Sequence, residues 1–286
     1  MTATAEPLRI ALPGLGLDLA AQACGDVHAP PLLALHGWLD NAASFATLAP
    51  LLAARHRVIA LDLPGHGHSA HLPPAARYDL ALYVASVREA AIALRLMRFS
   101  LLGHSLGGAV ASLYAAAFPG QIARLALIEA LGPLTDDGST TLQRWREALA
   151  APTDKSARVF PDAGQALAAR CRSTGQQPDA IRAIVARGLR QQEGGWVWRS
   201  DARLTATTPL RMAESQVHAL LAGIAAPTWL LLAEPESPWL PHVLLRARAA
   251  CVPRITIDTL AGGHHLHGEQ PAQVAALLRA FLHRGD

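Results

Sequence analysis

The sequence predicts an α/β protein in which a mostly parallel, doubly wound sheet of eight strands is interrupted by a helical insertion. Short apolar segments alternate with helical segments over most of the chain. This alternation stops at about residue 135 and resumes at about residue 216. Strands that alternate with helices form mostly parallel sheets covered on both faces. We therefore divide the 286 residues into a core domain, 1–134 and 216–286, and a helical cap, 135–215.

The expected strands are short apolar runs that end at glycine or proline turns. In chain order they span 8–12, 17–21, 31–35, 58–63, 99–102, 124–129, 228–233 and 255–260. The first two form an antiparallel pair joined by a Pro-Gly turn. Asn41 can cap a helix that runs to about Ala54, and Asp79 can cap the next helix, because their side-chain oxygens accept from first-turn N–H groups. In the insertion we expect helices and no strands.

The composition excludes several classes of protein. The chain is 51% hydrophobic and 16% charged, which is typical of a globular protein and not of a disordered one. It has an odd number of widely spaced cysteines, three, so we expect no disulfide framework and a cytoplasmic location. The start lacks a basic segment followed by an apolar one, and no apolar run is long enough to span a membrane. Basic residues are not interleaved with aromatic ones, so we expect no nucleic-acid partner.

The most informative motif is Gly103-His104-Ser105-Leu106-Gly107, which lies between an expected strand and an expected helix. G-x-S-x-G in this context forms a sharp turn that exposes a nucleophilic serine. The two glycines lack the Cβ atoms that would clash in such a turn. The serine then lies beside a helix N-terminus, whose unpaired N–H groups favour developing negative charge. We predict that Ser105 is a catalytic nucleophile.

This motif and three others resemble the α/β-hydrolase fold superfamily, and in particular its capped members such as the serine hydrolase-like proteins. The other segments are His36-Gly-Trp-Leu-Asp-Asn41, Leu61-Asp-Leu-Pro-Gly-His-Gly-His-Ser69 and Gly263-His264, so the resemblance spans nearly the whole chain. It implies an α/β-hydrolase core with a cap and a Ser-His-acid triad. The segment from Gly194 to Leu204 resembles the end of the cap in the serine hydrolase-like group.

The resemblance identifies the catalytic base. A serine hydroxyl needs a neighbouring histidine to accept its proton. In the family, this histidine follows a glycine and precedes a glutamate by five residues, and a proline opens the last helix. His264, Glu269 and Pro271 fit that pattern, whereas His265 and His267 do not. We expect His264 to be the base.

The catalytic acid is less well defined. In the family it follows the penultimate strand in a pattern like Gly-x-x-Asp, and this chain has Ala-Glu234-Pro-Glu236 there. Glu236 occupies the position equivalent to the aspartate, and the chain order Ser…Asp/Glu…His allows a glutamate. We expect Glu236 to be the acid. Glu234 and Glu129, the latter at the end of the strand after the nucleophile, are the alternatives.

The backbone N–H groups of Leu106, directly after the nucleophile, and of Trp38, just after His36-Gly37, are the expected oxyanion-hole donors. Candidate pocket residues are Trp38, His104, Trp145, Trp196 and Trp198. We expect no metal and no cofactor. Although His66, His68 and His71 are close in sequence, no cluster of carboxylates lies beside them.

These features predict a carboxylic ester hydrolase that acts on a small-molecule acyl ester through an acyl-serine intermediate. Acyl thioesters and carbon–carbon bonds are alternatives, because the same triad cleaves them. An excess of arginines between residues 140 and 211 makes an anionic substrate conceivable, such as a carrier-protein or coenzyme A ester. The alternative from another class is a ligand-binding or sensor protein built on a hydrolase scaffold.

Overall fold

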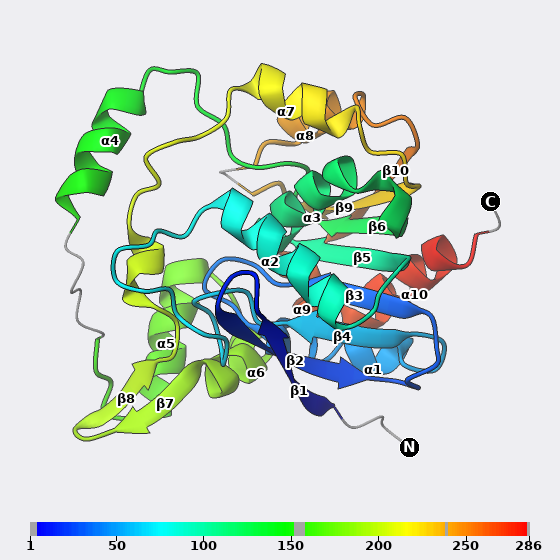
Figure 1. Ribbon diagram of the computed structural model, residues 1–286. Helices are drawn as coiled ribbons and strands as arrows, with labels where there is room; N and C mark the ends of the chain where they lie inside the picture. The colour runs from blue at the N-terminus through cyan, green and yellow to red at the C-terminus, as the bar shows by residue number, and fades with distance from the viewer. Residues whose placement is uncertain (1–4, 152–157, 238–239, 285–286) are drawn as a thin grey trace.

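The computed structural model describes residues 5–151, 158–237 and 240–284. At its centre is an eight-stranded sheet with the strand order β1-β2-β4-β3-β5-β6-β9-β10 (Figure 1). The β1–β2 and β2–β4 pairs are antiparallel and every other pair in this sheet is parallel, which confirms the predicted architecture. The strands are β1 (Glu6–Leu12), β2 (Leu17–Cys24), β3 (Pro31–Leu35), β4 (Arg57–Leu61), β5 (Phe99–His104), β6 (Ile122–Ile128), β9 (Thr228–Glu234) and β10 (Ile255–Ala261).

Helices cover both faces of the sheet. One face packs against α2 (Leu80–Ala93), α3 (Leu106–Ala117), α7 (Glu214–Leu221) and α8 (His242–Ala249). The other packs against η1 (Ala42–Phe45), α1 (Ala49–Leu52), α9 (Leu266–Glu269) and α10 (Pro271–Leu282). A short 3-10 helix, η2 (Pro119–Gln121), precedes β6. Among the described residues, no helix is both long and apolar enough to cross a membrane.

Side-chain alternation explains why these strands are apolar without interruption. In β3, Leu33 and Leu35 belong to the core under α2 and α3, whereas Leu32 and Ala34 belong to the core under α1 and α10. Successive side chains of a strand point to opposite faces, so a strand covered on both faces needs apolar residues at every position.

The described part of the insertion, between β6 and α7, contains three α-helices and a small hairpin. Its elements are α4 (Thr141–Ala150), α5 (Ala163–Thr174), α6 (Pro178–Gly188), β7 (Leu189–Gln192), β8 (Gly195–Trp198) and the 3-10 helix η3 (Ala202–Thr205). The expectation of no strands was wrong. Gln192 pairs with Gly195 and leaves a two-residue turn, in which Gly194 adopts a positive φ of 84° that suits glycine.

The helix expected from Asn41 to about Ala54 is broken into η1 and α1. The Asn41 side chain accepts from the Ala43 N–H at 3.0 Å, as a helix cap should. Pro50 then interrupts the helix, because proline has no N–H and its ring clashes with the carbonyl four residues earlier. It lies in the first turn of α1, where proline is tolerated.

Candidate active site

Ser105 lies in a strained turn between β5 and α3. Its φ of 51° and ψ of −117° are uncommon for a residue with a side chain. A Cβ on Gly103 would lie 2.5 Å from the Gly107 carbonyl oxygen, and a Cβ on Gly107 would lie 2.1 Å from the Leu35 carbonyl oxygen. The glycines therefore permit this turn for the reason expected from the sequence. The Ser105 N–H donates to the Ile128 carbonyl at 3.1 Å, which ties the turn to the end of β6.

His264 lies in the loop between β10 and α9, and its Nδ1 is 3.2 Å from Glu129 Oε2. Two contacts hold this loop. The Gly263 N–H donates to Glu269 Oε2 at 2.7 Å, and the His264 carbonyl accepts from His104 Nε2 at 2.9 Å. The glutamate five residues after His264 thus closes its loop. Because His104 directly precedes Ser105, the second contact joins the loop to the Ser105 turn.

Glu129 is almost completely buried at the end of β6 and has a positive φ of 53°. Its Oε1 accepts from the Ala233 N–H at 2.6 Å. Its Oε2 accepts from the Ser237 hydroxyl at 2.9 Å and faces His264. A buried carboxylate needs such donors, since an uncompensated charge inside a protein is costly. Glu129 is therefore held by β9 and the following loop in a position to orient the imidazole of His264.

The prediction that Glu236 contacts His264 was wrong. Glu236 is exposed, and its Oε2 accepts from the His242 N–H at 2.6 Å, at the start of α8. Glu234 is exposed too. The neighbour of Glu236, Ser237, turns inward and reaches Glu129 instead. Sequence spacing within the loop could not reveal this, because the acid comes from β6, which lies beside β9 in the sheet.

The two expected oxyanion donors lie on adjoining segments. The Gly107 N–H donates to the His36 carbonyl at 3.0 Å, which joins the start of α3 to the loop after β3. Leu106 is the first residue of α3, so its N–H has no partner within the helix. Among the described residues, neither this N–H nor that of Trp38 donates a hydrogen bond. Donors without a partner are what an oxyanion hole requires.

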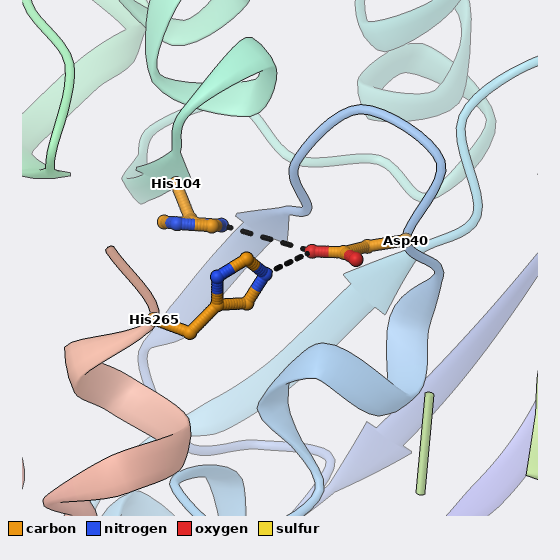
Figure 2. A group of neighbouring side chains, drawn as sticks. All are labelled: Asp40, His104 and His265. Carbon is orange, nitrogen blue, oxygen red and sulfur yellow. Dashed lines mark hydrogen bonds and ion pairs between the residues drawn. The ribbon is translucent and has the colours of Figure 1, made fainter. Parts of the chain in front are cut away.

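Asp40, His104 and His265 form a buried polar cluster next to these segments in the chain (Figure 2). Asp40 Oδ2 accepts from His265 Nε2 at 2.9 Å and is 3.9 Å from His104 Nδ1, while Asp40 Oδ1 accepts from Arg170 at 2.8 Å. Burial opposes ionisation of Asp40, but His265 and Arg170 outweigh it and hold the pKa of Asp40 well below its usual value. Burial, reinforced by neighbouring imidazoles, holds the pKa of His104 well below its usual value, so this ring is neutral.

Hydrogen bonds and ion pairs connect the insertion to the core domain near the candidate active site. Besides the Asp40–Arg170 pair, Arg187 of α6 donates to Asp62 Oδ2 at 2.7 Å. Asp62, which follows β4, also accepts from the Ala42 N–H at 2.7 Å. The Trp38 indole N–H donates to the Leu204 carbonyl at 3.0 Å. The loops that follow β3 and β4 therefore meet α5, α6 and η3.

The expected pocket residues lie in different environments. Trp38 is 50% exposed and Trp145, on α4, is 40% exposed. Trp196 and Trp198 pack against the small core of the insertion, beside Phe160. His104 is completely buried, so the expectation that it lines a pocket was wrong; it contacts the backbone of His264 instead.

Known proteins that are similar to this chain share its architecture or parts of its sequence. The model of the α/β hydrolase fold family matches residues 30–271. A serine hydrolase-like protein of Danio rerio is 28% identical over 277 residues, which cover 93% of this chain and 85% of that protein. A serine hydrolase-like protein of Homo sapiens is 44% identical over 111 residues, 39% of this chain and 55% of that protein.

Two solved structures extend the comparison. A hypothetical protein of Pseudomonas aeruginosa PAO1 is 40% identical with a TM-score of 0.90, and the match covers 98% of this chain and 100% of that one. A thioesterase domain from the curacin biosynthetic pathway is 25% identical with a TM-score of 0.84, covering 96% and 99%. Since the family model matches most of its length, the chain belongs to the α/β-hydrolase fold family.

Proposed function

We propose that this protein is a serine hydrolase that cleaves a carboxylic ester through an acyl-serine intermediate. The observation that carries the proposal is the contact of Glu129 Oε2 with His264 Nδ1 at 3.2 Å, in a loop that His104, the residue before Ser105, joins to the strained Ser105 turn. The names of its relatives, serine hydrolase-like proteins, support hydrolase activity. In this proposal Ser105 is the nucleophile, His264 the base and Glu129 the acid.

The reaction follows from these positions. Ser105 Oγ attacks the ester carbonyl while His264 Nε2 takes the hydroxyl proton, and Glu129 stabilises the imidazolium that forms. The N–H groups of Trp38 and Leu106 donate to the carbonyl oxygen as it becomes negative. Collapse of the tetrahedral intermediate breaks the bond to the alcohol, which leaves with the proton from His264. Water then repeats the sequence on the acyl-serine, releases the acid and restores Ser105.

The insertion acts in this proposal as a cap over the site, with residues 135–215 as its extent. Trp38 connects the oxyanion loop to η3 through its bond to Leu204, and half of its side chain is exposed. We propose that the Trp38 ring forms part of the wall against which the acyl group packs. Trp145 is the second candidate for this wall, whereas Trp196 and Trp198 serve the core of the cap.

An acyl thioester is the second candidate substrate. It is favoured by the similarity to the thioesterase domain, which extends over almost the whole of both chains. The triad chemistry is the same for a thioester, because only the leaving group differs. The proposal for Ser105, His264 and Glu129 does not depend on which of the two is cleaved.

Turnover of an acyl series tests the proposal. The substrates are p-nitrophenyl esters from acetate to palmitate, the matching acyl-coenzyme A thioesters and a β-diketone for carbon–carbon cleavage. We expect ester turnover that falls by about three to six orders of magnitude in Ser105→Ala, with an unchanged circular dichroism spectrum. Undiminished turnover in Ser105→Ala would refute the serine mechanism. No turnover of any substrate by the wild type would instead support a ligand-binding protein on this scaffold.

A further inference from the structure

The buried cluster of Asp40, His104 and His265 has a geometry that hydrogen bonding alone does not explain. The three side chains offer Asp40 Oδ2, His104 Nδ1 and His265 Nε2, which all lie within 4.8 Å of one another (Figure 2). Each comes from a different segment: the loop after β3, the end of β5 and the loop before α9. The three residues are at most 6% exposed.

The tautomer of His104 leaves a lone pair facing a carboxylate. His104 Nε2 lies 2.9 Å from the His264 carbonyl oxygen, which only accepts, so Nε2 carries the proton. Nδ1 of this neutral ring therefore carries a lone pair. It has no hydrogen-bond partner among the described residues, and it points toward Asp40 Oδ2 at 3.9 Å. Two buried lone pairs facing one another are unfavourable unless a cation or a proton lies between them.

A glycine lies beside these two atoms. A Cβ on Gly37 would lie 2.9 Å from His104 Nδ1 and 3.1 Å from Asp40 Oδ2. Any larger residue at this position would crowd both atoms. Because it has no side chain, Gly37 does not crowd the unpartnered His104 Nδ1.

We propose that Asp40, His104 and His265 form a binding site for a divalent transition-metal ion of the zinc type. Neutral imidazole nitrogens and a carboxylate oxygen are ligands that zinc takes, at about 2.0–2.2 Å. Ligands of a tetrahedral zinc then lie roughly 3.4 Å apart. The separations from Asp40 Oδ2 to His265 Nε2 and to His104 Nδ1, 2.9 and 3.9 Å, lie on either side of that value. The third separation, between His104 Nδ1 and His265 Nε2, is at most 4.8 Å. Shifts of about 1 Å therefore bring the three atoms around one ion, and a water would complete the set of four ligands.

A side chain that binds a metal through one polar atom is usually held by a hydrogen bond to its other polar atom. Asp40 and His104 have such hydrogen bonds. Arg170 donates to Asp40 Oδ1 and leaves Oδ2 for the ion. The His264 carbonyl holds the His104 tautomer with its free nitrogen toward the ion. For His265 to bind through Nε2, its proton must move to Nδ1, where it needs an acceptor.

Gln176 can provide that acceptor. Its amide nitrogen faces His265 Nδ1, while its Oε1 is buried and has no partner among the described residues. Rotating the amide by half a turn exchanges the two atoms, so that Oε1 accepts from His265 Nδ1–H. The proton is relocated on the same ring, and no net proton release is needed. The partners around the cluster therefore fit both the free and the metal-bound state.

The ion would join the three loops that carry the catalytic groups. Asp40 is two residues from Trp38, His104 precedes Ser105, and His265 follows His264. A ligand that binds only the folded protein raises its stability in proportion to the logarithm of its concentration. We therefore expect the ion to stabilise the fold and to fix the relative positions of these loops, independently of the substrate.

Zinc binding to the purified wild-type chain tests this site. Because all three ligands are buried, the protein is incubated with Zn²⁺ for long periods, freed of loose metal by dialysis and measured for zinc content and unfolding temperature. We expect one retained zinc per chain and an unfolding temperature raised by several degrees. Asp40→Asn and His265→Gln should each weaken zinc binding at least tenfold. The control is His71→Gln, which removes a histidine 3.7 Å from another carboxylate, Asp201, and should bind zinc normally.

A wild type that retains no zinc overturns the proposal, as does undiminished binding in both ligand variants. Circular dichroism shows whether these variants fold. If they do not fold, two measurements on the wild type test the site: the absorption spectrum with bound Co²⁺, and anomalous diffraction at the zinc edge. Tetrahedral Co²⁺ bands together with an anomalous peak between Asp40, His104 and His265 support the site. A peak found only elsewhere refutes it.

Discussion

Glu129 shows how one residue can be a weak candidate in the sequence and a strong one in the structure. It is separated from His264 by 135 positions and follows a strand with no motif of its own. Its position is fixed by its buried contacts with the Ala233 N–H and the Ser237 hydroxyl. Ser105 could be proposed from the sequence because its turn imposes a local pattern of glycines, and His264 because the residues around it match the family pattern. The acid has no such local constraint, so only the packing of β6 beside β9 reveals it.

Replacing Glu129 with Gln tests its role. The amide keeps the shape but removes the charge that stabilises the imidazolium, and it can present a donor to His264 Nδ1. We expect kcat for ester hydrolysis to fall by about 10³ to 10⁴ with little change in KM, as for acid-to-amide changes in other triads. The matched control is Glu236→Gln, whose side chain only caps α8. A large loss in Glu236→Gln and a small one in Glu129→Gln would return the role to Glu236.

His66 makes the stability of the protein depend on pH. It is completely buried, and burial together with neighbouring His36 lowers the pKa of His66 to about 3. Below about pH 6.5 the unfolded chain binds a proton on His66 that the folded chain does not bind until about pH 3. The free energy of unfolding should therefore fall with decreasing pH in this window, by about 1.4 kcal/mol per pH unit for this proton.

Urea unfolding at several pH values between 7.5 and 4.5 measures this slope. In His66→Gln the change in unfolding free energy with pH should be smaller by about 1.4 kcal/mol per pH unit, the contribution of one proton. This difference does not depend on the absolute stability of the variant. Equal slopes in the two proteins would show that His66 does not titrate differently on unfolding.

At the scale of elements, the sequence predicted the strands of the sheet better than the breaks in the helices and the structure of the insertion. Every expected strand of the core is present, because strands buried on both faces must be apolar throughout. The break at Pro50 and the hairpin of β7 and β8 were missed. Both depend on local backbone chemistry, a missing N–H and a glycine turn, that apolar periodicity does not report. The cluster of Asp40, His104 and His265 was missed because its members come from three distant segments.

The attachment of α6 to the core can be tested with two arginines on that helix. Arg187 pairs with the fully buried Asp62 at 2.7 Å, whereas Arg182 forms an exposed pair with Asp179. Arg187→Ala leaves a buried carboxylate without its cation and should lower the free energy of unfolding by about 3 kcal/mol. Arg182→Ala should change it by less than about 0.5 kcal/mol. Chemical denaturation of both variants gives the comparison, and similar losses would contradict the assigned role of Arg187.

At the scale of the whole molecule, the proposed catalytic residues all follow the carboxyl ends of parallel strands. Ser105 follows β5, Glu129 follows β6, and His264 lies three residues after β10. Open α/β sheets bind ligands at this edge. The insertion lies against the same edge, where Arg170 and Arg187 hold it to the loops after β3 and β4. The candidate catalytic residues thus lie on the sheet domain, and the insertion is a separate element beside them.

The central claim is that Ser105 becomes acylated with the help of His264 and Glu129. The most direct measurement is the site and rate of labelling by a fluorophosphonate, which attaches covalently to an activated serine and is located by peptide mass spectrometry. We predict a single adduct, on Ser105, that is absent in Ser105→Ala and forms at least a hundredfold more slowly in His264→Ala and Glu129→Gln. An adduct on another residue, or undiminished labelling in both His264→Ala and Glu129→Gln, would contradict the account.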